Sequence, residues 1–248
     1  MGCASKYYPF NQYPAECYGL CPGRQNIRMT KYDKIKLDVL NSATSLSEHG
    51  YLGKTSSGGN ISARLRDEKV LAITPSGRPY PQMTVDDICV IDYDGRLIEG
   101  PRSPSIEAAM HIAVYKRRPD VKAVIHTHQT FASVLSVINR SIPALFDEII
   151  VEIGSVVEII PYAFSGSSEL VKNVVAKLVN KCHCYLIQNH GALCLGADMA
   201  RAVRNSELLE NAAKIYYYAL TTGQEITTLP PAAADHFAEM RKLRFGAS

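Results

Sequence analysis

Apolar residues recur at helical spacing in several stretches of the chain. Between positions 30 and 49 the recurring residues are Tyr32, Ile35, Val39, Ala43 and Leu46. Gly50 follows them, where a helix commonly ends in a residue with a left-handed backbone. Comparable spacing predicts further helices over 105–116, 131–138, 167–179, 198–220 and 237–243.

Runs rich in β-branched residues lie between these helices and predict strands. They begin near position 61 and continue at 70–74, 88–92, 96–99, 121–128, 155–161, 185–189 and 192–195. Asp94-Gly95 joins two of them and is a typical hairpin turn. Because helices precede, separate and follow the strands, the sequence predicts an α/β fold in which helices cover a central, partly antiparallel sheet.

The stretch 121–128, VKAVIHTH, carries the chemistry of greatest interest. On a strand, residues two apart point to the same side, so His126 and His128 should project together. Glu107 lies in the first turn of a predicted helix, and His190 follows a predicted strand. One carboxylate and three histidines at the ends of separate elements could close around Zn²⁺ and leave a position for substrate. The alternative is that each histidine is a hydrogen-bonded structural residue.

Several polar segments could bind an anion. Gly59 and Asn60 follow another glycine, the turn 74–77 contains Ser76 and Gly77, and Ser105 is expected to cap the helix that carries Glu107. Glycines allow close approach of the backbone to an anion, and turn N–H groups and hydroxyls can cradle phosphate. None of these segments has the spacing of a nucleotide-binding loop.

Two further motifs admit competing interpretations. His111 lies one helical turn after Glu107, so it is either a hydrogen-bond partner of the metal site or a satisfied helix histidine. Cys182-His183-Cys184 is either a second metal site, with both thiols on one side of a strand, or a run of buried strand residues. No second ligand pair accompanies the two cysteines, which favours buried thiols.

Composition excludes several classes of protein. Hydrophobic residues make up 46% and charged residues 21%, the formal net charge is +3, and no basic block indicates nucleic acid or an acidic membrane. No apolar run is long enough for a spanning helix, and the N-terminus lacks the apolar core of a signal peptide. Met1-Gly2-Cys3 suggests lipidation, but Lys6 occupies the position where myristoylation requires Ser or Thr. The seven cysteines are an odd number and do not form the even disulfide framework of a small secreted protein. They indicate reduced thiols in a cytoplasm.

The chain divides into two parts by composition. Residues 1–27 are rich in Tyr, Pro and Cys without helical or strand periodicity. We expect either an arm that packs over the body or a partner subunit, or a partly disordered segment. Residues 28–248 are expected to form a single catalytic domain.

Seven short motifs occur in the order and separation found in the class II aldolase/adducin-head family. They are Gly-Asn-Ile-Ser (59–62), Thr-Pro-Ser-Gly (74–77), Glu-Gly (99–100), Pro-Ser-Ile-Glu (104–107), His-Thr-His (126–128), Ser-Ile-Pro-Ala (141–144) and Asn-His-Gly (189–191). The resemblance covers roughly residues 30–245 and is strongest to the branch that cleaves L-fuculose 1-phosphate. It implies a three-layer α/β/α sandwich around a largely antiparallel sheet and a homotetramer with active sites between subunits.

The resemblance also implies roles for individual residues. Glu107, His126, His128 and His190 match zinc ligands, with Mn²⁺, Fe²⁺ or Co²⁺ as other ions that such ligands accept. Glu107 matches the catalytic acid/base as well. The residues that match substrate-phosphate contacts are Gly59, Asn60, Ser76, Gly77, Ser105 and Ile106.

The chain departs from that branch at three places. Ile106 replaces the second of two serines, Asp147 and Glu148 stand in the region of a catalytic tyrosine, and Phe245-Gly246 corresponds to a C-terminal tyrosine and glycine. We expect Asp147 and Glu148 to help protonate or position the aldehyde oxygen.

The expected reaction is zinc-dependent, reversible cleavage of a ketose phosphate to dihydroxyacetone phosphate and a small aldehyde. A metal-dependent decarboxylase or dehydratase of the same family is the alternative, and the loss of a serine at Ile106 favours it. A metal-free, adducin-like interaction module is the non-enzymatic alternative, and it predicts that the metal ligands are lost.

Overall fold

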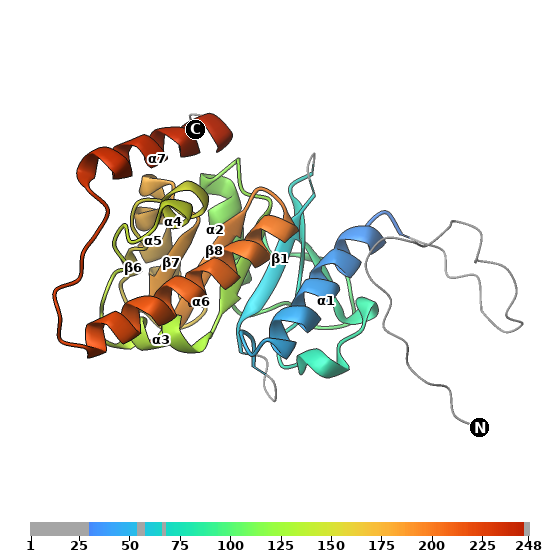
Figure 1. Cartoon of the computed structure of the whole chain (residues 1–248). Helices are drawn as coiled ribbons and strands as arrows, with labels where there is room; N and C mark the ends of the chain where they lie inside the picture. Colours follow the sequence, from blue (N-terminus) through green and yellow to red (C-terminus); the bar gives the residue numbers. More distant parts are fainter. Residues whose placement is uncertain (1–29, 54–57, 66–67, 246–248) are drawn as a thin grey trace, which may run out of the picture. The chain divides into compact units, whose positions relative to one another are not determined.

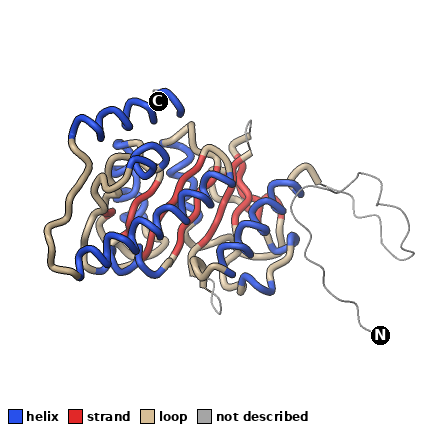
Figure 2. Tube along the Cα trace, viewed as in Figure 1, coloured by secondary structure: helices blue, strands red, loops and turns tan. Residues whose placement is uncertain are grey.

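Eight strands form one sheet in the order β4-β3-β2-β1-β5-β8-β7-β6 in a computed structural model that describes residues 30–53, 58–65 and 68–245 (Figure 2). Every neighbouring pair is antiparallel except β6 and β7, which are parallel. The strands are β1 (Asn60–Arg64), β2 (Val70–Ile73), β3 (Cys89–Asp92), β4 (Leu97–Glu99), β5 (Ala123–Thr127), β6 (Ile159–Ile160), β7 (Cys184–Ile187) and β8 (Gly191–Gly196). The largely antiparallel sheet is therefore confirmed.

Helices cover both faces of this sheet (Figure 1). One face packs against α1 (Asp33–Glu48), α3 (Thr130–Val137), α4 (Asp147–Glu152) and α6 (Met199–Thr221). The opposite face packs against α2 (Ala108–Arg117) and α5 (Ser168–Lys177). The short 3-10 helices are η1 (Tyr80–Gln82), η2 (Val85–Asp87) and η3 (Leu178–Asn180). The expected three-layer α/β/α arrangement is confirmed.

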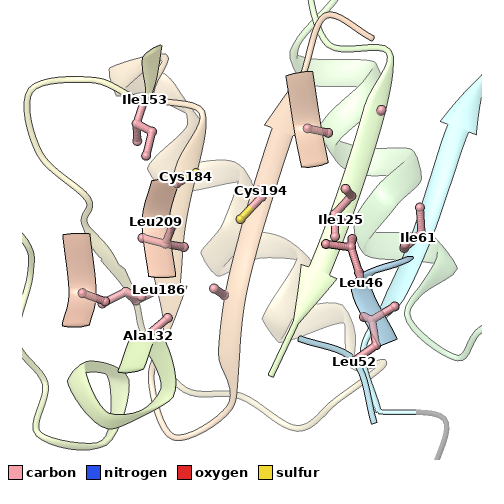
Figure 3. Packing of buried hydrophobic residues seen from close by; sticks show 14 of the residues in the cluster. Leu46, Leu52, Ile61, Ile125, Ala132, Ile153, Cys184, Leu186, Cys194 and Leu209 are labelled. Atoms are coloured by element: carbon pink, nitrogen blue, oxygen red, sulfur yellow. The ribbon is translucent and has the colours of Figure 1, made fainter. Parts of the chain in front are cut away.

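The sheet separates two hydrophobic clusters. Ile125 and Leu186 belong to the cluster under α1 and α6, which Figure 3 draws, whereas Val124 and Ile187 belong to the cluster under α2 and α5. Successive strand residues point to opposite faces, and both faces are buried, so the central strands read as continuous apolar runs.

The end of α1 prepares one wall of the site described below. Gly50 has φ +77°, the Tyr51 N–H donates to the Leu46 carbonyl over 2.9 Å, and the Gly50 N–H donates to Ser47 over 3.0 Å. This is the Schellman arrangement that the glycine predicted. The turn directs the Tyr51 carbonyl toward β5, where it accepts the His128 N–H at 2.9 Å.

The C-terminal helix α7 (Pro231–Phe245) is longer than the predicted 237–243 and contacts α4. Arg241 donates to the Val151 and Glu152 carbonyls at 3.0 and 2.8 Å, and Arg244 pairs with the Glu152 carboxylate. These carbonyls lie at the end of α4, where a helix lacks internal donors. Helix α4 was not predicted, because six residues are too few to display a helical period.

The predicted strand 155–161 is wrong in its length. Only Ile159–Ile160 form β6, and Val157 makes an isolated bridge with Ile142. The segment lies at the sheet edge, where pairing on one side only leaves a short ladder.

The predicted arm, residues 1–27, lies outside the described residues. The described residues from position 31 onward form one compact unit. None of the helices described there has the length and apolar character of a membrane span.

Candidate active site

Three histidine rings converge at one end of β5. His126 is the fourth residue of that strand, His128 follows its end, and His190 closes the turn between β7 and β8. The Nε2 atom of His126 lies 3.0 Å from Nε2 of His128 and 3.2 Å from Nε2 of His190. The predicted same-side projection of His126 and His128 and the approach of His190 from another element are both observed.

Two glycines let the backbone segments approach closely enough to form this cluster. A Cβ on Gly191 would lie 2.2 Å from the Thr127 carbonyl oxygen, and a Cβ on Gly59 would lie 2.6 Å from the His126 carbonyl oxygen. Gly59 also has φ +78°, in the left-handed region. The glycines on both sides of β5 therefore fix the position of the histidine-bearing strand end.

His126 is fully buried, and its hydrogen bonds define which nitrogen faces the cluster. Its Nδ1 lies 2.9 Å from the Ala192 carbonyl oxygen, which can only accept, so Nδ1 carries the proton. The Nε2 lone pair then points toward His128 and His190. Burial and the two neighbouring rings hold the pKa of His126 well below its usual value, and desolvation lowers the pKa of His128. Neutral imidazoles are the form that binds a metal ion.

Glu107 brings a carboxylate to the same cluster. Its Oε2 lies 3.4 Å from Nε2 of His126 and accepts a 2.8 Å hydrogen bond from the Asn60 side chain. Its Oε1 lies 3.6 Å from Nε2 of His190 and has no hydrogen-bond partner, although the side chain is buried. A buried carboxylate oxygen without a partner is costly unless a cation or a ligand compensates it.

The prediction that Ser105 caps the helix is wrong. Helix α2 begins at Ala108, and Glu107 itself occupies the N-cap position without forming a side-chain cap. Ser105 Oγ instead accepts the Glu107 N–H at 3.3 Å. Because the carboxylate is not used as a cap, it is free to face the histidines.

The four side chains fit a divalent metal ion. Zinc binds imidazole nitrogens at about 2.0–2.1 Å in tetrahedral geometry, which separates two ligand nitrogens by about 3.3 Å. The 3.0 and 3.2 Å separations from the His126 nitrogen are close to this value, and the unpartnered Glu107 Oε1 lies 3.6 Å from Nε2 of His190. Among the described residues, the group of at least three His, Cys, Asp or Glu side chains that could hold a metal is His126, His128 and His190.

A cavity of about 170 Å³ opens beside this cluster. Its lining brings together most of the residues predicted to contact substrate, and these are Gly59, Asn60, Ser76, Ser105 and Ile106, together with Gly58, Pro75, Glu107, His128, Ser165 and His190. Gly77 does not line it and instead forms the adjacent turn with φ +67°. Ile106 is 66% exposed and presents an apolar side chain at the cavity.

His111 is a fully buried residue behind the site. Its Nδ1 lies 2.7 Å from Ser62 Oγ, which also contacts the Tyr115 hydroxyl at 2.7 Å, while Nε2 has no partner. Burial lowers the pKa of His111 to about 3, so the ring is neutral. The His111 ring bonds to Ser62 and not to the Glu107 carboxylate, and the two residues share only the backbone bond from the His111 N–H to the Glu107 carbonyl.

Among the described residues, Asp147, Glu148 and Phe245 do not line the cavity. Asp147 and Glu148 begin α4, and Glu148 pairs with Arg204 at 3.0 Å. Phe245 packs against the His183 ring, with centroids 5.4 Å apart, and Gly246 is outside the described residues.

The alternative metal site at Cys182, His183 and Cys184 is not formed. Cys182 belongs to the cluster under α2 and α5, whereas Cys184 belongs to the cluster on the opposite face. The His183 Nδ1–H donates a 2.9 Å hydrogen bond to the Glu152 carbonyl oxygen. The strand begins only at Cys184, so the alternation that would align the two thiols does not extend to Cys182.

Ser165 is a site residue that no sequence motif marks. Its Oγ lies 3.4 Å from Nε2 of His190, and it lines the cavity. A single serine in a loop carries no spacing signal, so only the tertiary structure reveals it.

Several proteins of known activity are similar to this chain in sequence. The chain is 33% identical over 190 residues to a 3-oxo-tetronate 4-phosphate decarboxylase of Haemophilus influenzae, covering 75% of this chain and 87% of that protein. It is 32% identical over 197 residues to the L-fuculose phosphate aldolase of Escherichia coli K12, covering 79% and 89%. It is 33% identical over 196 residues to an L-ribulose-5-phosphate 4-epimerase of Salmonella paratyphi C, covering 75% and 85%.

The fold comparison leads to the same group of proteins. A solved structure of an L-fuculose 1-phosphate aldolase superposes with a TM-score of 0.77 at 33% identity, covering 84% of this chain and 96% of that one. Residues 38–217 match the family model described as the class II aldolase and adducin N-terminal domain. This chain therefore belongs to the class II aldolase and adducin N-terminal domain family.

Proposed function

We propose that this chain is a zinc-dependent aldolase that reversibly cleaves a ketose phosphate similar to L-fuculose 1-phosphate. The products would be dihydroxyacetone phosphate and a small aldehyde. The observation that carries the proposal is the unpartnered Oε1 of Glu107, buried and 3.6 Å from His190 Nε2 at the edge of a cavity. The similarity to an L-fuculose phosphate aldolase supports the same reaction.

His126, His128 and His190 would hold the ion, which when bound supplies Lewis-acid polarisation of a substrate carbonyl. In the cleavage direction, the hydroxyl on the carbon that becomes the aldehyde gives its proton to the Glu107 carboxylate as the aldehyde carbonyl forms. The electron pair of the broken C–C bond then takes a proton from Glu107 and becomes a C–H bond of the ketone product. The Asn60 amide, 2.8 Å from Glu107 Oε2, keeps the other carboxylate oxygen directed at the substrate.

The phosphate would bind on the wall made by Gly59, Asn60, Ser76 and Ser105. These residues line one cavity and offer hydroxyl, amide and backbone N–H donors. Gly77 shapes the turn that presents Ser76. Ile106 would contact the substrate through its backbone or its apolar side chain, since it has no hydroxyl to donate.

Asp147 and Glu148 would assist the aldehyde half only if another copy of the chain brings them to the cavity. We therefore propose a homotetramer whose sites lie between subunits, in which residues 28–248 are the catalytic domain and 1–27 an arm. Light scattering at micromolar concentration should give four chains. A fully active monomer would refute the shared site.

We also propose that the protein acts in the cytoplasm on a small molecule, with no nucleic-acid or membrane partner. The described cysteines, Cys89, Cys182, Cys184 and Cys194, are free and buried, as in reducing compartments.

A metal-dependent decarboxylase is the second candidate function. Ile106 removes one hydroxyl from the phosphate wall, and a relative 33% identical to this chain is a 3-oxo-tetronate 4-phosphate decarboxylase. The same Glu107 would protonate the carbon that carbon dioxide leaves. A dehydratase would use this carboxylate to take a proton from carbon and to return it to the departing hydroxyl group, which leaves as water.

One experiment separates these candidates. The zinc-loaded chain is incubated with a panel of ketose 1-phosphates and a panel of 3-oxo acid 4-phosphates, while dihydroxyacetone phosphate and carbon dioxide are measured together. Release of dihydroxyacetone phosphate without carbon dioxide supports the aldolase. Carbon dioxide release alone replaces it with the decarboxylase, and the absence of both products rejects the two proposals.

A further inference from the structure

Ser165 lies on the segment between β6 and α5 and borders the histidine cluster. Its Oγ is 3.4 Å from Nε2 of His190, and it lines the cavity together with Glu107 and His128. Ser165 comes from a different segment of the chain than the glycine and serine residues of the proposed phosphate wall. It therefore adds a hydroxyl beside the metal ligands.

The backbone on either side of Ser165 is anchored. Gly166 has φ +74°, and a Cβ at that position would lie 3.0 Å from the Ile106 carbonyl oxygen. The Ser167 N–H donates to the Phe164 carbonyl over 3.0 Å, and Ser167 Oγ caps α5 by accepting the Leu170 N–H. The backbone just after Ser165 therefore passes close to the Ile106 carbonyl and leads directly into the capped start of α5.

The chemistry of His190 determines what this hydroxyl can do. An imidazole Nε2 has one lone pair, which serves either as an acceptor for Ser165 or as a ligand to a metal ion, but not both. The three convergent nitrogens and the unpartnered Glu107 oxygen favour the metal. With the metal bound, the Ser165 O–H loses its acceptor while its position next to the ligand atom is kept. An oxygen atom of a ligand that approaches the metal is then the acceptor within reach.

We propose that Ser165 donates a hydrogen bond to a substrate oxygen at the reacting carbons and thereby selects substrates with a hydroxyl, oxo or carboxylate oxygen there. This inference rests on the proposed metal-dependent function and deepens it. The recognised group is the oxygen next to the bond that breaks, not the phosphate. Ser165 is exposed, so an apolar substituent in that place would simply lack the hydrogen bond that an oxygen there would accept.

The test uses binding to the zinc-loaded full chain and needs no turnover. Calorimetry measures the affinity of glycolate, which offers a hydroxyl and a carboxylate oxygen, and separately of inorganic phosphate. For Ser165→Ala we expect about 10-fold weaker glycolate binding, as for loss of one hydrogen bond to a charged group, with phosphate affinity and zinc content unchanged. Ser165→Thr keeps the hydroxyl and should bind glycolate within about threefold of the parent, the spread expected for a retained hydrogen bond.

Ser168→Ala is the matched control, because Ser168 is an exposed serine at the first position of α5 that does not line the cavity. It should leave both affinities unchanged. The proposal is overturned if the parent does not bind glycolate, or if Ser165→Ala binds it equally well. It is also overturned if that variant loses phosphate binding or zinc instead.

The proposed aldolase function fails by a different measurement. If the parent releases no dihydroxyacetone phosphate from any ketose phosphate while the glycolate difference at Ser165 persists, the reaction is wrong and the Ser165 contact stands. If cleavage is observed while Ser165→Ala has unchanged glycolate affinity, the contact is wrong and the reaction stands.

Discussion

The Asn60 side chain donates to Oε2 of Glu107 over 2.8 Å, and the two residues are 47 positions apart in the chain. Asn60 begins β1 and pairs in register with His126 on β5. The same register that places Asn60 beside the histidine strand therefore also orients the carboxylate. The opposite oxygen, Oε1, is left without a partner and faces the metal site.

Replacement of Asn60 by alanine should lower kcat with little loss of zinc. The carboxylate loses a hydrogen bond to a charged group, and such bonds contribute about 1.5–3 kcal/mol, so we expect at least a tenfold decrease in kcat. Activity and zinc content are measured on one preparation. Asn173→Ala is the control. It removes a 3.2 Å hydrogen bond from the Asn173 side chain to the Pro161 carbonyl, does not change a residue of the cavity lining, and should retain kcat. Equal kcat in both variants would show that Asn60 does not position Glu107.

Glu107→Gln should keep most of its zinc and lose turnover. Three histidines already supply enough ligands, and glutamine retains an oxygen but cannot accept the substrate proton. General acid–base catalysis typically contributes about 10²–10⁴-fold, and the loss should appear in kcat. If Glu107→Gln turned over within about threefold of the parent, the proton would have to be handled elsewhere, since acid–base loss is larger than that. Asp147 and Glu148 would then be tested next.

His126→Ala should lose the metal. His126 contributes the central Nε2, within 3.2 Å of both other rings, and two remaining histidines make a weaker site. Elemental analysis after zinc-supplemented purification should give about one ion per parent chain and below about a tenth in the variant. His49→Ala is the matched control, because His49 is exposed at the end of α1 and outside the cluster. Unchanged zinc in His126→Ala would refute the assigned centre.

Gly191→Ala should destabilise the fold by about 3 kcal/mol or more. The added Cβ would clash with a backbone carbonyl oxygen, which cannot move aside as a flexible side chain can. The added Cβ would lie 2.2 Å from the Thr127 carbonyl oxygen and 2.8 Å from the His128 ring. Chemical denaturation measures the free energy of unfolding. Gly223→Ala has open space around its Cβ and only the strain of φ +68°, about 1–2 kcal/mol. A smaller loss for Gly191→Ala than for Gly223→Ala would contradict the packing argument.

Acid should destabilise the fold in part through His183. Burial, followed by the positive charge of Arg241, lowers the pKa of His183 to about 3 from its ordinary 6.5. The unfolded chain therefore takes up a proton that the folded chain refuses. The stability from neutral His183 is complete above pH 6.5 and is lost as the pH falls from 6.5 toward 3, by at most about 1.4 kcal/mol per pH unit.

The measurement is the free energy of unfolding between pH 7 and pH 4 for the parent and for His183→Gln. Glutamine cannot take up the proton and can still donate to the Glu152 carbonyl. The variant should therefore lose stability less steeply with acid. Identical slopes in the two proteins would exclude His183 as a source of the acid sensitivity.

Local geometry explains what could be predicted from the sequence alone. The alternation of a strand placed His126 and His128 on one side, and the apolar spacing of 30–49 with Gly50 marked α1 and its end. Both patterns depend on residues within a few positions of each other, so no long-range contact is needed to predict them. The order of the seven short motifs indicates the family without any tertiary contact.

Only the tertiary structure determined which distant residues meet. The pairing of β1 with β5 brought Asn60 to Glu107, the β7–β8 turn brought His190 to the cluster, and the loop before α5 brought Ser165. The tertiary structure also shows that Ser105 does not cap α2 and that Cys182 and Cys184 belong to hydrophobic clusters on opposite faces of the sheet. Strand register and the path of a loop depend on packing between segments far apart in the chain, and a single sequence records no contact between such segments.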